Sequence, residues 1–338
     1  MGLDISQLQP IPERNDVAFR DLKTLLANQE TPIVLRGFVA HWPLVAKAQV
    51  SALQALRYLE QHSTQEPVTV FNVAPNADGR VFYNESATGF NYRVLNGPFS
   101  RLAQQLSTSN NEALGAFYLG STLFGRWFPE IDTEHSTVLD EISPLKSLWL
   151  GQKSKVAIHS DFPLNLACNV IGKRRFVLFP PEQISNLYIG SLDFTPAGRP
   201  ISMVNLNEPD FDAFPRFAEA LKHAQFVDLT PGDCLYIPSM WWHYVEGLED
   251  INAQINYWWR DEKSVIGSPT DALTHALLAI RQLPAHEKAA WKAFFDYYLF
   301  SDEFDTNHIP HELLGVFDGS NTQQQLNVKK QLARNLER

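Results

Sequence analysis

Hydrophobic residues near the start of the chain recur every three or four positions, which is the spacing of one face of an α-helix. The pattern predicts helices over residues 16–30 and 51–62, with Ser51 as the N-cap of the second, and a short helix over 98–106. Between the first two, the run IVLRGF that follows Pro32 reads as a buried strand. Over residues 67–95 the pattern changes to short β-type runs, VTVFNV and RVFY, so the N-terminal part mixes helices and strands.

The middle of the chain alternates short apolar runs with turn residues, a pattern typical of many short strands. We expect strands in AFYLGSTLF, SLWLG, KVAIHSD, NLACNVI, RRFVLFPP, CLYIPSMWWHYVE and NAQINYWW. Short strands separated by long excursions favour a barrel or a double-sheet jelly roll. Beyond about residue 268 the spacing is helical again, in TDALTHALLAIRQL and EKAAWKAFFDYYLF, with Pro284 between them.

Composition narrows the class of protein. The chain has 338 residues, of which 44% are hydrophobic and 20% charged, so general disorder is excluded. Its net charge of -10 makes a nucleic-acid partner less favoured, because a phosphate backbone repels an acidic surface. We expect neither a signal peptide nor a membrane span, since no apolar run is long enough. Only two cysteines occur, Cys168 and Cys234, which excludes a disulfide framework and favours buried thiols in a cytoplasmic protein.

Candidate metal ligands stand out in two of the expected strands. His159 and Asp161 lie two residues apart, so on a strand they share a face and can bind one ion. His243 follows much later and could join them only through folding; it shares strand parity with Trp241 and should face inward. Two imidazoles and one carboxylate form the ligand set of non-haem Fe(II) oxygenases. On spacing alone, His159 could equally be an interior histidine bonded to a backbone carbonyl.

The phrases around these residues resemble a known family. HSD, GKRRFVLFPP, PGDCLYIPSMWWH and QINYWW occur in the order typical of the JmjC/cupin-like 2-oxoglutarate oxygenases, and TPIVLRGFVAHWP upstream is similar too. The pattern is most similar to the branch of the asparaginyl hydroxylase that inhibits hypoxia-inducible factor. The resemblance covers most of residues 30–260. It implies a mostly β, double-stranded β-helix (jelly-roll) barrel with flanking helices, Fe(II) as the metal and 2-oxoglutarate as the co-substrate.

The resemblance also implies roles for individual residues, and no catalytic residue beyond the metal ligands. The iron ligands match His159, Asp161 and His243, and residues near the co-substrate match Tyr118, Asn165 and Asn256. Arg174 stands where the family has a lysine for the far carboxylate, and Val156 where it has a threonine. A guanidinium fork can grip a carboxylate through two hydrogen bonds. Adjacent strand residues alternate, so one of Lys173 and Arg174 should face inward, and we favour Arg174.

These patterns together predict a JmjC/cupin-like domain over residues 1–268 and a C-terminal helical module over 269–338. The apolar helix faces of the module predict a homodimer, in agreement with the resemblance. The expected activity is hydroxylation of a protein side chain or a small molecule, although demethylation stays open. Two alternatives also remain: a cupin-fold enzyme that uses another metal without 2-oxoglutarate, and a binding module with a vestigial metal site. Six histidines outside the site, His135 among them, are expected at the surface, whereas His41 is expected to be structural.

Overall fold

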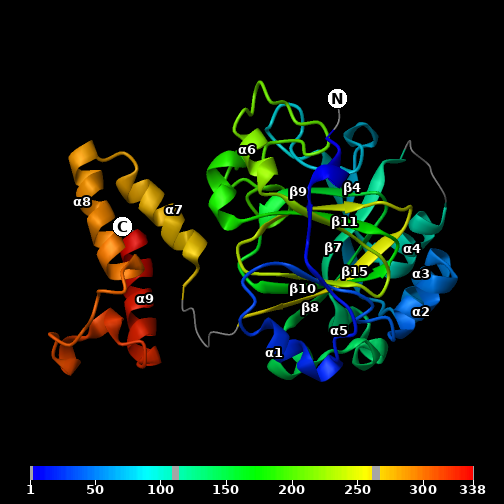
Figure 1. Ribbon diagram of the computed structural model, residues 1–338, viewed down its shortest axis with the longest axis horizontal. Coiled ribbons are helices and arrows are strands. Elements are labelled where there is room, and N and C mark those ends of the chain that lie inside the picture. Colours follow the sequence, from blue (N-terminus) through cyan, green and yellow to red (C-terminus); the bar gives the residue numbers. More distant parts are fainter. Residues whose placement is uncertain (1–2, 109–113, 261–266, 338) are drawn as a thin grey trace. The chain divides into compact units, whose positions relative to one another are not determined.

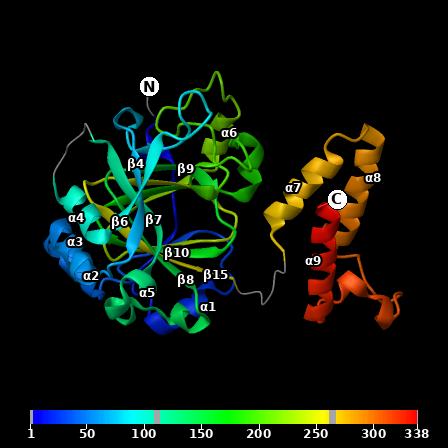
Figure 2. The same cartoon turned by 180° about the vertical axis from the view of Figure 1, so that it is seen from behind.

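The computed structural model describes residues 3–108, 114–260 and 267–337. Contacts within the chain divide it into two compact units, one ending at Arg260 and the other beginning at Asp261. The first unit combines two β-sheets with flanking helices, and the second is helical (Figures 1 and 2). The mostly β fold class with flanking helices that the sequence predicts is confirmed.

Two sheets form the first unit in the part of the chain that the structure describes. The smaller has the order β1 (Gln9–Pro10), β12 (Gln225–Leu229), β11 (Arg174–Phe179), β14 (Trp242–Gly247), β9 (Lys155–Ser160) and β5 (Arg80–Val81). The larger has the order β2 (Glu13–Arg14), β3 (Ile33–Leu35), β13 (Cys234–Ile237), β10 (Leu164–Ile171), β15 (Asn252–Trp259), β8 (Leu145–Gly151), β7 (Ala116–Leu123), β4 (Pro67–Val73) and β6 (Tyr92–Pro98). Pairing among the central strands of both sheets is antiparallel.

Apolar side chains from both sheets meet in one core cluster. Phe176 of β11 and Val245 of β14 belong to the smaller sheet, and they pack with Ala167 of β10 and Leu235 of β13 from the larger one. Because successive side chains of a strand point to opposite faces of the sheet, every second side chain of these strands points away from this interior. A cavity for a ligand can therefore form where the interior residues are polar.

Helices cover the outer face of the larger sheet. They are α1 (Leu22–Leu26), α2 (Pro43–Val50), α3 (Ala52–Gln61), α4 (Phe99–Ser107) and α5 (Phe124–Trp127), and α2, α3 and α4 lie side by side in both views (Figures 1 and 2). Their apolar residues share a core cluster with Leu166 and Tyr257 of the sheet. The predicted N-cap is confirmed, since the Ser51 hydroxyl accepts a hydrogen bond from the Gln54 backbone N–H at 3.1 Å. On the smaller sheet, α6 (Phe217–Lys222) packs Phe217 against β11.

The predicted strand CLYIPSMWWHYVE is wrong in one respect, because it forms two strands in different sheets. β13 ends at Ile237 and β14 begins at Trp242. Pro238 has no N–H for a ladder, and Met240 has a positive φ of 68°, so the chain turns here. The Met240 N–H donates to the Asp161 carbonyl at 2.9 Å, which ties the turn to the end of β9. The crossing between sheets thus brings β14 beside β9.

The second unit consists of helices within residues 267–337. They are α7 (Pro269–Ile280), α8 (Ala285–Phe295), a π-helical turn (Asp296–Phe300), two short 3-10 helices (His311–Leu313 and Gly315–Phe317) and α9 (Thr322–Leu336), and the sequence did not predict α9. Rings of Tyr298, Phe304 and Phe317 contact one another within the unit. None of the described residues of this unit is buried. Across the described ranges of the whole chain, no helix has the length and apolarity needed to cross a membrane.

Candidate metal centre and co-substrate cavity

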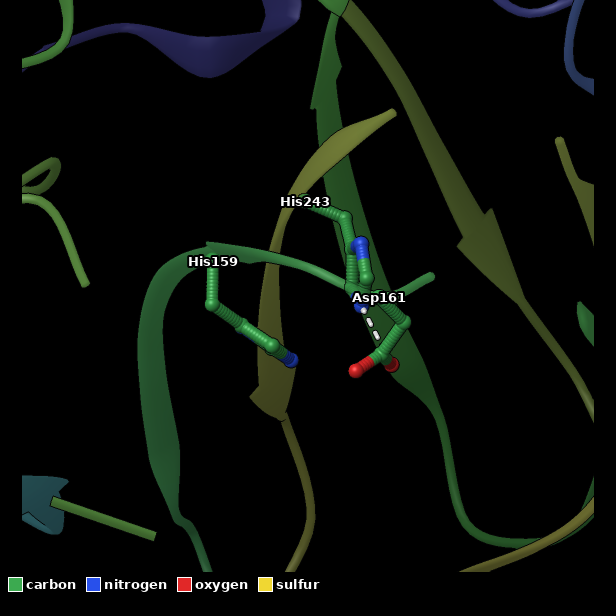
Figure 3. Close-up of side chains that lie close together, drawn as sticks. All are labelled: His159, Asp161 and His243. Atoms are coloured by element: carbon green, nitrogen blue, oxygen red, sulfur yellow. Dashed lines mark ion pairs between the residues drawn. The ribbon is translucent and has the colours of Figure 1, made fainter. Parts of the chain in front are cut away.

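Two neighbouring strands place the predicted metal ligands together. His159 of β9 and His243 of β14 are direct partners in the antiparallel ladder, so their side chains share a face, and their ring centroids are 4.2 Å apart. Asp161 follows the end of β9 and points toward both rings (Figure 3). One ligand atom from each of the three residues lies within 4.8 Å of the others. The arrangement can hold one divalent ion.

Backbone hydrogen bonds fix which nitrogen of each imidazole faces the centre. Nδ1 of His159 lies 2.8 Å from the Ala157 carbonyl oxygen, and Nδ1 of His243 lies 3.0 Å from that of Trp241. A carbonyl only accepts, so each Nδ1 carries the proton and each Nε2 keeps its lone pair for a metal. Burial and the neighbouring imidazole lower the pKa of His243 to about 4, which keeps this ring neutral at neutral pH. The donor set therefore fits Fe(II) or a similar divalent ion.

The Asp161 carboxylate divides its two oxygens between different partners. Oδ1 lies 3.2 Å from Nε of Arg199, and Oδ2 lies 3.7 Å from Nε2 of His243. Arg199 comes from the irregular segment before Ile201, which forms an isolated bridge with His159. The arginine therefore orients the carboxylate from the rim of the site. The sequence did not indicate Arg199, because no motif or regular spacing links this irregular segment to the metal ligands.

Arg174 lines the same cavity as the three metal ligands and is almost fully buried, with 2% of its surface exposed. Its Nε and Nη2 have no hydrogen-bond partner among the residues that the structure describes. Burial lowers the pKa of Arg174 to about 10, so the side chain remains a cation at neutral pH. Lys173 faces outward instead, 3.5 Å from an oxygen of Asp228. A buried cation without a counter-charge fits an anionic ligand.

The other residues predicted to contact the co-substrate line this cavity as well: Tyr118, Asn165 and Asn256. The Asn256 side-chain N–H donates to the Asn165 side-chain oxygen at 2.9 Å. Burial raises the pKa of Tyr118 to about 12, so its hydroxyl stays protonated and can donate. The structure therefore brings all seven predicted site residues into one cavity between the two sheets.

Comparison with known proteins places this cavity in a family. The family profile for the cupin-like domain matches residues 20–264, which include every residue of the cavity. The chain belongs to the cupin-like domain family.

Human HSPB1-associated protein 1 is 34% identical over 134 residues, which are 39% of this chain and 27% of that protein. Lysine-specific demethylase 8 of Xenopus tropicalis is 24% identical over 245 residues, covering 68% of this chain and 48% of that protein. Jumonji C domain-containing protein 5 of Drosophila melanogaster is 34% identical over 131 residues, 37% of this chain and 31% of that protein. The chain thus spans less than half the length of these relatives.

Further residues of this cupin-like domain face the cavity without having been predicted as ligand contacts. Gln254 and Trp258 flank Asn256 at alternate positions of β15, and Trp149 lies on β8. Strand parity with Asn256 could have found the first two, because residues two apart share a face. Val156, which carries no polar group, also lines the cavity.

The prediction that His135 lies at the surface is wrong. Its side chain is buried, Nδ1 lies 2.7 Å from the Ile131 carbonyl oxygen, and Nε2 accepts from the Leu44 N–H at 3.2 Å. Burial lowers the pKa of His135 to about 4. Its polar flanking residues suggested exposure, whereas the ring packs among the helices, and the His135 backbone carbonyl accepts a hydrogen bond from the Tyr257 hydroxyl of β15 at 2.6 Å. Cys168 and Cys234 are free and buried, as predicted.

Proposed function

We propose that this cupin-like protein is an Fe(II)- and 2-oxoglutarate-dependent oxygenase, and that it hydroxylates a protein side chain or a small molecule. The observation that carries the proposal is the unpaired buried cation of Arg174 in the same cavity as the His159–Asp161–His243 cluster. A metal-binding face and an anion-binding group in one cavity suit a co-substrate with a chelating end and a second carboxylate.

Each residue has a definite task in this proposal. His159, Asp161 and His243 would hold Fe(II) and leave the remaining coordination positions open. Arg174 would bind the far carboxylate, and the protonated hydroxyl of Tyr118 would donate to it. Bound together, Fe(II) and 2-oxoglutarate supply oxidation of a C–H bond by O2, with succinate and carbon dioxide as co-products. The protein positions the reactants and excludes water.

A protein substrate has support from the relatives' names. One of them is called a lysine-specific demethylase, a term that refers to side-chain chemistry on a protein. The net charge of -10 makes a nucleic-acid substrate less favourable. The free thiols of Cys168 and Cys234, partners in the β10–β13 ladder, suit the reducing cytoplasm that we propose as the location.

We also propose that the C-terminal module, residues 269–338, mediates a homodimer. Large apolar side chains remain exposed on it, including Leu278 at 80% and Phe300 at 76%. Helices with this much exposed apolar surface need a partner surface. A two-fold pairing would cover the same residues of both chains at once.

The test is anaerobic loading with Fe(II) followed by addition of 2-oxoglutarate, O2 and candidate peptides or small molecules. We expect succinate, and a mass increase of the true substrate by one oxygen atom. The His159→Ala/Asp161→Ala double variant is the control and should produce neither. Tight metal binding without any binding of 2-oxoglutarate would instead favour a cupin-fold enzyme with other chemistry, and loss of both would favour a binding module.

A further inference from the structure

Two polar side chains without an assigned role face each other inside the cavity. Trp149 of β8 and Gln254 of β15 are direct partners in the antiparallel ladder, so both project from the same face of the larger sheet. The Trp149 ring lies 6.2 Å from that of Tyr118 and 5.7 Å from that of Trp258, measured between centroids. Tyr118 in turn interacts electrostatically with Arg174. Trp149 and Gln254 therefore belong to the neighbourhood of the buried cation.

Both side chains hold a buried polar atom that is unsatisfied within the described residues. These atoms are Nε1 of Trp149 and Oε1 of Gln254, and Arg174 adds two more in the same cavity. Gln254 is 6% exposed. Buried polar groups in native proteins nearly always have a partner, so a cluster of such groups in one cavity indicates a polar ligand.

The unsatisfied N–H donors of the cluster, on Arg174 and Trp149, fit a carboxylate. The two oxygens of a carboxylate can accept about four hydrogen bonds in total. Arg174 offers its fork, Trp149 an indole N–H, and Gln254 an amide whose soft terminal torsion can turn its NH2 group toward the ligand. Val156, at the position where the resembling family carries a hydroxyl, offers no donor.

We propose that Trp149 and Gln254 complete the clamp on the far carboxylate, so that the site selects 2-oxo acids with a second carboxylate over those without one. This inference rests on the proposed function. Trp149 and Gln254 would act as specificity residues, with Arg174 providing the charge and these two the remaining hydrogen bonds. Within the described part of the chain, neither residue hydrogen-bonds to a metal ligand, so metal affinity should not depend on them.

The test measures ligand binding by calorimetry on the full chain, loaded with Mn(II) in the absence of O2. Trp149→Phe removes the N–H together with the five-membered ring that carries it, and Gln254→Leu replaces the amide by an apolar group of similar size. Each should weaken 2-oxoglutarate binding about tenfold, the size expected for a hydrogen bond to a charged group. Gln254→Glu places a carboxylate in the same cavity as Arg174 and should weaken binding by roughly a hundredfold or more. Oxalate, which chelates the metal but reaches no farther, should bind the wild type and all three variants equally.

Matched controls have the same residue types outside the cavity. Gln225 and Trp127 each hold an unsatisfied buried polar atom but do not line this cavity, so Gln225→Leu and Trp127→Phe should bind 2-oxoglutarate as the wild type does. Circular dichroism and Mn(II) affinity identify any variant that has not folded. The 2-oxoglutarate affinities of the variants that do fold then test the inference. Wild-type affinity for 2-oxoglutarate in the folded variants would overturn this inference while leaving the proposed function intact. An equal loss of oxalate binding would also overturn it. A wild-type protein that binds Mn(II) but no 2-oxoglutarate would overturn the proposed function and this inference together.

Discussion

Replacing Arg174 by methionine should stabilise the protein in the absence of ligand. Burial lowers the pKa of Arg174 from 12.5 to about 10, so the charged form is less stable in the folded chain than in the unfolded one. Below pH 10 the side chain is protonated in both states and the full cost applies; the cost disappears as the pH rises from about 10 toward 12.5. At roughly 1.36 kcal/mol for each pKa unit, the shift corresponds to about 3 kcal/mol.

Methionine retains much of the length of arginine without the charge. We therefore expect the free energy of unfolding at pH 7 to rise by roughly 1–3 kcal/mol in Arg174→Met, as happens when other buried charges are replaced by apolar groups. The assay is urea unfolding followed by tryptophan fluorescence, with and without Mn(II) and 2-oxoglutarate. At a ligand concentration of about 100 Kd the wild type should gain roughly 2.7 kcal/mol, whereas the variant should gain almost nothing at that concentration.

Arg175 provides the matched control, since it follows Arg174 on β11 but faces the other way. Its guanidinium contacts both Asp228 oxygens, at 2.7 and 2.9 Å, and is partly exposed. Arg175→Met should leave stability unchanged or lower it by up to about 1 kcal/mol. If Arg174→Met is instead destabilised by more than about 1 kcal/mol, the guanidinium already has a compensating partner without ligand, and the inference of an anion site fails.

Three further predictions concern other parts of the molecule. The His159→Ala/Asp161→Ala double variant should lose stoichiometric Fe(II) binding in anaerobic equilibrium dialysis, and unchanged affinity would exclude this metal centre. The neutral, buried His135 has its pKa lowered from 6.5 to about 4, so its contribution to stability is complete above pH 6.5 and is lost as the pH falls toward 4. His135→Gln should remove roughly 3 kcal/mol of that pH dependence in urea titrations, and an unaltered profile would contradict the assignment. Light scattering of the intact chain should give about twice 38.3 kDa, and Leu278→Glu should shift the mass toward the monomer; a monomeric wild type at micromolar concentration would refute the dimer.

The sequence by itself determined the class of fold and the ligand types. Apolar alternation and turn residues predicted the central strands, because the period of two is a local property of the chain. The same local rule put His159 and Asp161 on one face and made Arg174 and Lys173 face opposite ways. The resemblance of the motifs to a known family then supplied the remaining candidates, such as Tyr118.

Only the tertiary structure decided which residues meet. The turn at Pro238 moves the chain from one sheet to the other, and the resulting β9–β14 register sets His243 opposite His159. The same kind of long-range pairing brings Trp149 opposite Gln254 and leaves Arg174 without a counter-charge among the described residues. Strand register depends on contacts between residues far apart in the chain, which no local spacing records. The sequence could therefore name the groups that would bind a metal and a carboxylate, while their common cavity follows from how the two sheets close around it.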